Sequence, residues 1–149
     1  SALCQNINVY LNGAGNASIV AADLDGGSAD NCGSISLSAS QTVFICADIG
    51  TNNITLTATD ANSNTSSCTA VVTVIDTISP IATCQDINIY LDGSGNASIT
   101  GSDVDGGATD NCGSVTATVS QTAFTCADEG IAPSSGLIIS GVYDCPLPG

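Results

Sequence analysis

The chain has 149 residues, with 13 Asp, one Glu and no Lys, Arg or His, so its formal net charge is −14. A uniformly negative surface repels nucleic acid and anionic lipid, so neither is an expected partner. Hydrophobic residues make up 43% of the chain, which excludes a disordered acidic tail. No apolar run approaches the roughly 18 residues that a membrane span needs.

Alternation of apolar and polar residues with a period of two predicts six short strands in the first half of the chain. In chain order, the apolar residues that share one face are Ile7, Val9 and Leu11; Ala17, Ile19 and Ala21; Ile35, Leu37 and Ala39; Val43 and Ile45; Ile54, Leu56 and Ala58; and Ala70, Val72 and Val74. Turns are expected between these runs at Asn12–Gly13, Gly26–Gly27, Asn31–Gly33, Gly50–Asn52 and Asn62–Asn64. Six or seven short antiparallel strands in about 80 residues are typical of an immunoglobulin-like β-sandwich.

The chain contains an internal repeat. Cys4–Gly50 and Cys84–Gly130 are identical at 29 of 47 positions without a gap. The repeat predicts two tandem immunoglobulin-like domains, over residues 1–79 and 80–149, that stack end to end across a junction stiffened by Pro80. Repeat 2 diverges after Gly130, and its last strand is expected to be missing or contributed by another segment.

Eight cysteines without any His or CxxC pair favour disulfides in an oxidising compartment over zinc. Four cysteines per repeat allow three connectivities. We favour a short bridge beside the DNCG turn and a long bridge that ties the first strand to the last. The four predicted disulfides are Cys4–Cys68, Cys32–Cys46, Cys84–Cys145 and Cys112–Cys126.

An acidic motif, D-x-D-G-G-x-x-D, occurs once in each repeat. It places carboxylate oxygens on a loop whose glycines permit tight turns, as Ca²⁺ sites require. The predicted ligands are Asp23, Asp25 and Asp30 with their counterparts Asp103, Asp105 and Asp110, and Asp60 and Asp76 are further candidates. The alternative is that these residues form ordinary Asx turns that cap the loops.

Catalysis is not expected. Neither Ser nor Cys has a neighbouring His or Lys to act as its base. Paired carboxylates can hydrolyse glycosides, but here they lie on predicted turns and are duplicated between the repeats.

The combination of C-Q-x-I-x-V-Y-L, NASI, D-x-D-G-G, D-N-C-G, A-T-D-A-N-S-N-T-S-S-C and V-I-D-T-I-S-P resembles hyalin-type (HYR-like) repeats over about residues 4–130. These repeats occur in very large secreted surface proteins of Bacteroidota. The resemblance implies strings of immunoglobulin-like domains, export to the cell surface, and roles in adhesion or appendages. It also implies an O-linked glycan on Thr77, within Asp76-Thr77-Ile78. The segment after Gly130 departs from the pattern and resembles the opening of another module.

Two functions follow as expectations. The first is a structural segment of an extracellular filament, in which copies of the chain pack head to tail as a homopolymer. The second is an adhesin module that recognises a glycan or another surface protein. Carbohydrate is usually bound by stacking on aromatic rings, and the chain has only three Tyr, two Phe and no Trp. Tyr10 and Tyr90 alternate with core positions, so they are expected either to face outward, where they could bind a sugar, or to be partly buried between strands.

Overall fold

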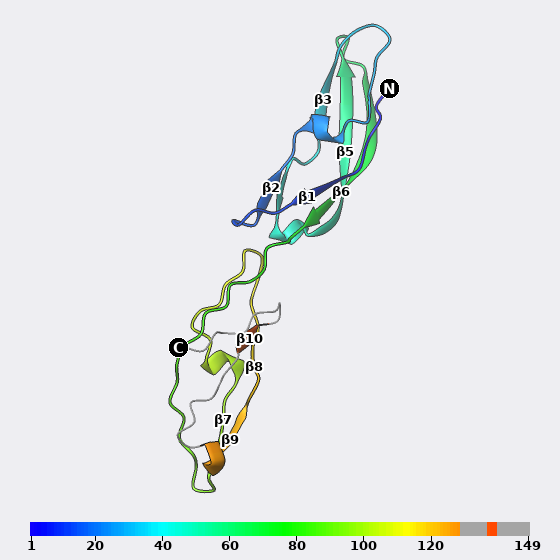
Figure 1. Ribbon diagram of the computed structural model, residues 1–149. Coiled ribbons are helices and arrows are strands. Elements are labelled where there is room, and N and C mark those ends of the chain that lie inside the picture. Colours follow the sequence, from blue (N-terminus) through cyan, green and yellow to red (C-terminus); the bar gives the residue numbers. More distant parts are fainter. Residues whose placement is uncertain (129–136, 140–149) are drawn as a thin grey trace. The chain divides into compact units, whose positions relative to one another are not determined.

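The computed structural model describes residues 1–128 and 137–139. It confirms an all-β protein: the described residues form strands and short 3-10 helices, without an α-helix (Figure 1). None of the described helices is long and apolar enough to cross a membrane. The chain divides into two compact units, unit 1 over Ser1–Ile78 and unit 2 over Ser79–Gly149.

Unit 1 contains a four-stranded sheet in the order β1-β6-β5-β3. Its strands are β1 (Ile7–Tyr10), β3 (Ile35–Ala39), β5 (Gly50–Asp60) and β6 (Thr65–Ile75). The long strands β5 and β6 form an antiparallel hairpin, and β3 pairs antiparallel with the outer side of β5. On the other side, β1 pairs parallel with β6, with Tyr10 opposite Ile75.

A second, two-stranded sheet in unit 1 joins β2 (Asn16–Ser18) to β4 (Val43–Ile45). The short 3-10 helices η1 (Ala21–Leu24) and η2 (Cys46–Asp48) follow these two strands. The chain leaves β3, which pairs with β5, and after a short connection enters β4, which pairs with β2. This change of sheet carries the chain to η2 and then into the start of β5.

The core of unit 1 lies between these sheets. β5 and β6 contribute the alternating residues that the sequence predicts, and β1 and the loops add to them. The buried set is Val9, Leu11, Ile19, Leu24, Phe44, Ile54, Leu56, Ala58, Ala70, Val72 and Val74.

The prediction that Val43 and Ile45 lie on the inward face of β4 is wrong. Phe44 is completely buried, whereas Val43 and Ile45 are 58% and 49% exposed. Three consecutive apolar residues do not define which face of a strand points inward. The aromatic ring in the middle contributes the largest apolar area, so it takes the inward position.

Two predicted boundaries also differ from the structure. Ala21, expected to continue the second strand, begins η1, because the carboxylate of Asp23 accepts a hydrogen bond from the backbone of Val20 and closes a turn there. The turn expected at Gly50–Asn52 is instead the first part of β5, where Gly50 pairs with Val74.

Unit 2 repeats parts of this arrangement. β7 (Asn96–Ser98) pairs with β9 (Ala123–Thr125), as β2 pairs with β4 in unit 1. The helices η3 (Gly101–Asp103) and η4 (Cys126–Asp128) follow them. The core contains Ile99, Val104 and Phe124, with smaller residues packed around them.

The sequence after Gly130 contributes to unit 2. β10 (Leu137–Ile139) pairs antiparallel with β8 (Ala117–Val119), which is the relationship between β5 and β3 in unit 1. This segment, expected to open another module, therefore supplies a strand to the second repeat. The end of repeat 2, where its last strand is expected to be missing or contributed by another segment, lies outside the described residues.

Replacement of Phe44 by Ala is expected to destabilise unit 1 by about 3–5 kcal/mol, because it removes a large buried side chain and leaves a cavity. Val43→Ala, on the exposed face of the same strand, is expected to change stability by no more than about 0.5 kcal/mol. Hydrogen exchange of β5 and β6 peptides in denaturant measures the free energy of unfolding of unit 1 in both variants. An equal loss of stability in the two variants would contradict the burial of Phe44.

Candidate functional site

Unit 1 has two opposite ends. The entry end contains Ser1, the Ala29–Cys32 loop and the β5–β6 turn: Ala29 donates a backbone hydrogen bond to Ser1, and Ile35, just after the loop, pairs with Asp60. The exit end contains η2, the first residue of β5 and the last residue of β6 (Figure 1). The 11 residues of β5 separate these ends by roughly 33 Å, at about 3.3 Å for each of the ten steps between them.

The long disulfide Cys4–Cys68 is present, as predicted, with its Cα atoms 5.8 Å apart. Cys68 lies in the middle of β6 opposite Leu56, and Cys4 forms an isolated bridge to Asp25. The disulfide therefore fastens the N-terminal segment and the acidic loop to β6, one of the two inner strands of the sheet.

The short predicted disulfides are wrong. Cys32 and Cys126 are free and exposed, so neither Cys32–Cys46 nor Cys112–Cys126 is formed. Cys32 lies at the entry end, and Cys46 opens η2 at the exit end. A disulfide requires Cα atoms within about 7 Å, which the length of β5 excludes.

Three further cysteines, Cys46, Cys84 and Cys112, are disulfide-bonded. The predicted partner of Cys84 is Cys145, which lies outside the described residues. The Cys46 sulfur also lies 3.6 Å from the carbonyl oxygen of Gly15, in the turn between β1 and β2.

The DxDGG loop of unit 1 uses its carboxylates to hold its own backbone. Asp23 accepts a hydrogen bond from the Val20 amide at 2.7 Å. Asp25 accepts from the amides of Gly27 and Ser28 at 3.2 and 2.7 Å. Asp30 accepts from the Cys32 amide at 3.0 Å. Each acid therefore closes a local turn.

The same bonds recur in unit 2. Asp103 accepts from the Thr100 amide at 2.7 Å, and Asp105 accepts from Gly107 and Ala108 at 3.0 and 2.7 Å. Asp110 accepts from the Cys112 amide at 2.9 Å. The repetition indicates that these acids have a common structural role as turn caps.

The other two candidate ligands also cap turns. Asp60 accepts from the amides of Asn62 and Asn64 and from the Asn64 side chain, each at 2.8 Å, and so closes the β5–β6 turn. Asp76 accepts from the Ile78 amide at 3.1 Å, after β6. Among residues 1–128 and 137–139, no three His, Cys, Asp or Glu residues converge as a metal site.

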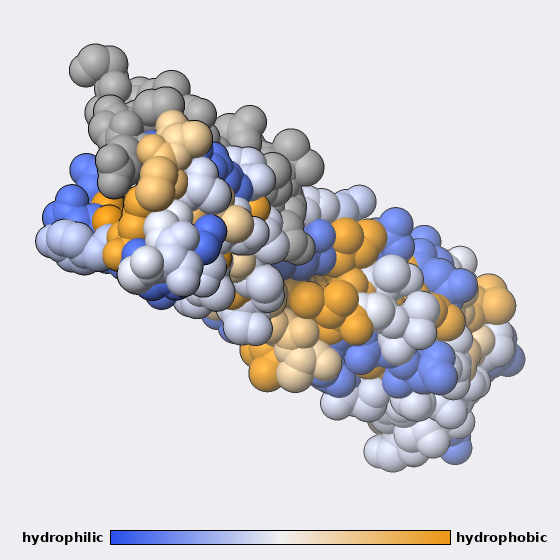
Figure 2. Space-filling view, turned by 90° about the horizontal axis from the view of Figure 1, so that it is seen from below, coloured by the Kyte–Doolittle hydropathy of each residue, from blue (hydrophilic) through white to orange (hydrophobic). Residues whose placement is uncertain are grey.

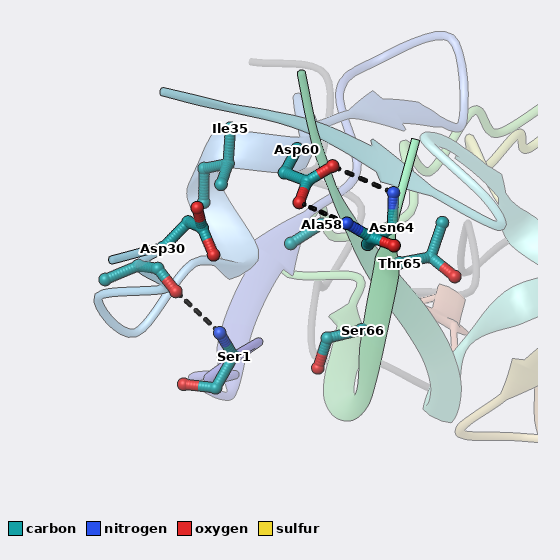
Figure 3. A pocket seen from close by; sticks show the side chains of 9 residues that line it. Ser1, Asp30, Ile35, Ala58, Asp60, Asn64, Thr65 and Ser66 are labelled. Carbon is teal, nitrogen blue, oxygen red and sulfur yellow. Dashed lines mark hydrogen bonds between the residues drawn. The ribbon is translucent and has the colours of Figure 1, made fainter. Parts of the chain in front are cut away.

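A small pocket opens at the entry end of unit 1, with a volume of about 180 Å³ (Figure 3). Asp30 and Asp60 lie on two sides of it, and the Ser1 ammonium, which donates to the Ala29 carbonyl, lies on a third. Asn64 is turned toward Asp60 by their hydrogen bond. The pocket combines two carboxylates with the apolar side chains of Ala29, Ile35 and Ala58, and both carboxylates already accept hydrogen bonds from neighbouring amides.

Sequence analysis missed three further capping acids, Asp48, Asp128 and Asp92. Asp48 and Asp128 each accept a hydrogen bond from the amide three residues before them, Ile45 at 2.9 Å and Thr125 at 2.8 Å. Asp92 closes the turn before β7 by accepting from the Ser94 and Asn96 amides. The signal that could have identified the first two was present, because Asp48 and Asp128 hold the same position in the two repeats.

Hydrogen bonding lowers the pKa of several of these carboxyl groups. The Ser28 side chain and amide lower the pKa of Asp25, and the Asn64 side chain and amide lower that of Asp60. The pKa of Asp105 is lowered by the Ala108 and Gly107 amides. In each case the donors favour the charged form.

The surface combines apolar and polar side chains (Figure 2). Tyr10 and Tyr90 are 58% and 87% exposed, so both face outward. Thr77, the predicted glycosylation residue, is exposed in the segment after β6 and outside any strand.

No protein-family model and no curated protein sequence matches this chain.

Acid is expected to weaken the turns. A carboxyl group whose pKa is lower in the folded state stabilises the fold above its ordinary value of 3.8, and this contribution is lost as the pH falls through the folded-state pKa. We expect the melting temperature of the protein to decrease when the pH is lowered beyond about 4, the range in which these carboxyl groups become protonated. The measurement is made in about 1 M salt, where interactions between charges are screened beyond about 3 Å. Asp105→Asn should reduce this fall, because the amide oxygen still accepts the two hydrogen bonds but does not titrate.

Asp86→Asn is the matched control. Asp86 is exposed and accepts no hydrogen bond within the described part of the chain, so its replacement removes the same charge without a turn. An equal change of the pH profile in both variants would show that net charge, rather than turn capping, controls acid stability.

Calcium binding stays a prediction. In unit 2 the second oxygen of Asp110 is buried and has no hydrogen-bond partner among the described residues, which leaves it available to a cation. If Ca²⁺ binds only the folded state, a chelator at fixed ionic strength lowers the melting temperature. An unchanged melting temperature in both the wild type and Asp110→Asn would leave turn capping as the only role of these acids.

Proposed function

We propose that this chain is a structural segment of an extracellular filament, built of tandem immunoglobulin-like domains. The observation that carries the proposal is that the hydrogen bonds which close the loops of unit 1 recur at equivalent positions of unit 2. Gln5 donates to the Asp23 carbonyl at 3.0 Å, and Gln85 donates to the Asp103 carbonyl at the same distance. Tandem repetition of one structural unit is typical of extended arrays, in which each unit contacts only its neighbours.

The strand arrangement of unit 1 supports the immunoglobulin-like part of this proposal. A four-stranded sheet faces a smaller sheet, and the chain changes sheet between β3 and β4. The parallel pairing of β1 with β6 places the first and last strands of the unit side by side. A unit this short buries only a small core, so a covalent tie adds substantially to its stability.

An extracellular location is part of the proposal. The Cys4–Cys68 disulfide closes a loop of about 65 residues, which contributes about 4 kcal/mol in the chain-entropy model. Such bonds form and persist in oxidising compartments.

The proposed role is mechanical rather than catalytic. The acids that a glycosidase mechanism would need cap turns in both repeats, so their recurrence follows from the loops. The lowered pKa values keep these groups ionised, whereas a general acid needs a raised pKa.

The second candidate is an adhesin module. The observation that favours it is the exposure of Tyr10 and Tyr90, which hold the same position in the two repeats. An exposed ring at a regular interval suits stacking on a sugar. Loss of glycan binding in Tyr10→Ser and Tyr90→Ser variants with unchanged melting temperatures would support this function.

Assembly of the purified chain is expected to depend on salt. At a net charge of −14, copies repel each other over about 30 Å at 10 mM salt and over about 8 Å at 150 mM. We therefore expect monomers at low ionic strength and filaments at high protein concentration near physiological ionic strength. Sedimentation velocity and electron microscopy measure the two states, and a chain that remains monomeric at every salt concentration would refute the filament proposal.

A further inference from the structure

The outer face of the four-stranded sheet in unit 1 consists mainly of short hydroxyl side chains (Figure 1). On each strand these side chains alternate with residues that point toward the core. We call this surface the hydroxyl face. Its central members are Ser36 and Ser38 on β3, Thr55 and Thr57 on β5, and Ser67 and Thr69 on β6.

Strand pairing brings these hydroxyl groups side by side. Thr55 lies opposite Thr69 and Thr57 lies opposite Ser67, while on the other side of β5 Ser38 lies opposite Thr57. Directly opposed residues have Cβ atoms about 4.5–5.5 Å apart, so the hydroxyls form rows across the sheet. Those of Thr55, Thr57, Ser67 and Thr69 form no hydrogen bond with another residue in the described part of the chain, which leaves them available to another molecule.

Strand propensity alone does not explain the hydroxyl pattern. Thr favours strands, but Ser is not among the residues enriched in them. In the second repeat, Thr116 and Thr118 stand where Ser36 and Ser38 stand in the first, whereas the inward Leu37 becomes Ala. A hydroxyl is therefore retained at these outward positions even where the residue changes.

The hydroxyl face carries no charge, although the chain has 14 acidic residues and no basic one. The four strands of its sheet contain a single acid, Asp60, which lies at the end of β5 and caps the β5–β6 turn. Carboxylates flank the small β2–β4 sheet, in contrast, because Asp23 and Asp48 accept hydrogen bonds from Val20 and Ile45. Two copies can therefore approach each other through the hydroxyl face with little charge repulsion.

The capacity for hydrogen bonds between copies also points to this face. A carboxylate only accepts hydrogen bonds, so the acidic surfaces of two copies cannot bond to each other. Because the chain has no Lys, Arg, His or Trp, its side-chain donors are hydroxyls, amides and thiols. A hydroxyl both donates and accepts, so a face of hydroxyls is complementary to its own copy, as a two-fold contact requires.

The area of the hydroxyl face suits a weak interface. Its four strands, of 4, 5, 11 and 11 residues, cover about 500 Å² at about 3.3 Å per residue and about 4.8 Å between strands. Two such faces in contact bury about 1,000 Å², and transient protein pairs bury less than about 1,200 Å² in total. The short side chains also lose less rotamer freedom on packing than Lys, Arg or Glu side chains would.

We propose that the hydroxyl face of unit 1 packs against the same face of a second copy and forms a weak side-by-side dimer. The inference goes beyond the proposed filament, because it concerns the sides of the chain and holds for copies that do not form filaments. Sheets in face-to-face contact lie about 10 Å apart, a distance that two layers of short side chains fill. Between two arrays of units, many such contacts act together, so weak pairs produce stable bundles.

The test uses the 149-residue chain with Cys32→Ser and Cys126→Ser, so that these exposed thiols cannot join two copies. Sedimentation equilibrium of this parent chain at about 150 mM salt should show monomers and dimers in equilibrium. Thr69→Asp places a charge near the centre of the face in both copies, and it should raise the dimer dissociation constant about tenfold or more. In about 1 M salt, where charges are screened beyond about 3 Å, much of the dimer should return.

Ser18→Asp is the matched control. Ser18 is exposed on β2, in the small sheet across the core from the hydroxyl face, so its replacement adds the same charge and the same poor strand former elsewhere. Its dimer dissociation constant should stay within about twofold of the parent value, because the added charge is screened from the contact. Equal weakening in both variants would overturn the inference, since net charge alone would then control association. Melting temperatures check that both variants fold, and Thr55→Asp on the neighbouring strand replaces Thr69→Asp if that variant does not.

Other results separate the inference from its alternatives. A parent chain that stays monomeric at every protein and salt concentration would overturn it. A monomeric chain that binds insoluble cellulose, and loses this binding in Thr69→Asp, would also overturn it and assign the face to a neutral glycan. Filaments whose sides do not pair would overturn the inference and leave the filament function in place, whereas dimers that never grow into filaments would overturn the filament function alone.

Discussion

Hydrogen bonds from backbone amides to aspartate carboxylates are the interaction on which both repeats depend. The chain has no Lys, Arg or His, so its carboxylates have no cationic side chain to pair with. A carboxylate accepts several hydrogen bonds, and bonds to a charged acceptor are about twice as strong as neutral ones. Asp25, Asp60 and Asp105 each hold two amides of their own loop. The acids that set the net charge of the protein therefore also set the shape of its turns.

This interaction explains why the loops are the same in both repeats while part of the core is not. A turn cap depends on one carboxylate at a fixed distance along the chain from its amides, so it is local in sequence. The sheet depends instead on pairing between distant segments. After Gly130 the sequence of repeat 2 changes, yet β10 still pairs with β8, because strand pairing needs an extended backbone rather than particular side chains. The acidic loops do not tolerate a comparable change of sequence, because each turn cap needs a carboxylate at a fixed position.

Much of unit 1 could be predicted from its sequence because its long strands alternate regularly. Ile54, Leu56 and Ala58 on β5 and their neighbours on β6 are buried as the period of two requires. Short strands carry less information: β4 has three apolar residues in succession, and only the packing of Phe44 decides its phase.

The cysteine pairing shows the same division between local and distant information. The long bridge Cys4–Cys68 follows from joining the first strand to the last. The prediction of the short bridge was wrong because closeness in sequence does not imply closeness in space. Between Cys32 and Cys46 the chain runs through β3 and β4 in nearly one direction, from one end of the unit to the other, and no pattern in the sequence records that β4 continues the path of β3 rather than turning back.

The absence of positive side chains also limits how this protein can contact another copy of itself. Most protein interfaces gain orientation from pairs of opposite charges, and here no such pair exists between two copies apart from the chain termini. Any contact must rely on apolar residues, neutral hydrogen bonds, bound cations or covalent bonds, and it must act against repulsion between acidic ends such as the one that carries Asp30 and Asp60.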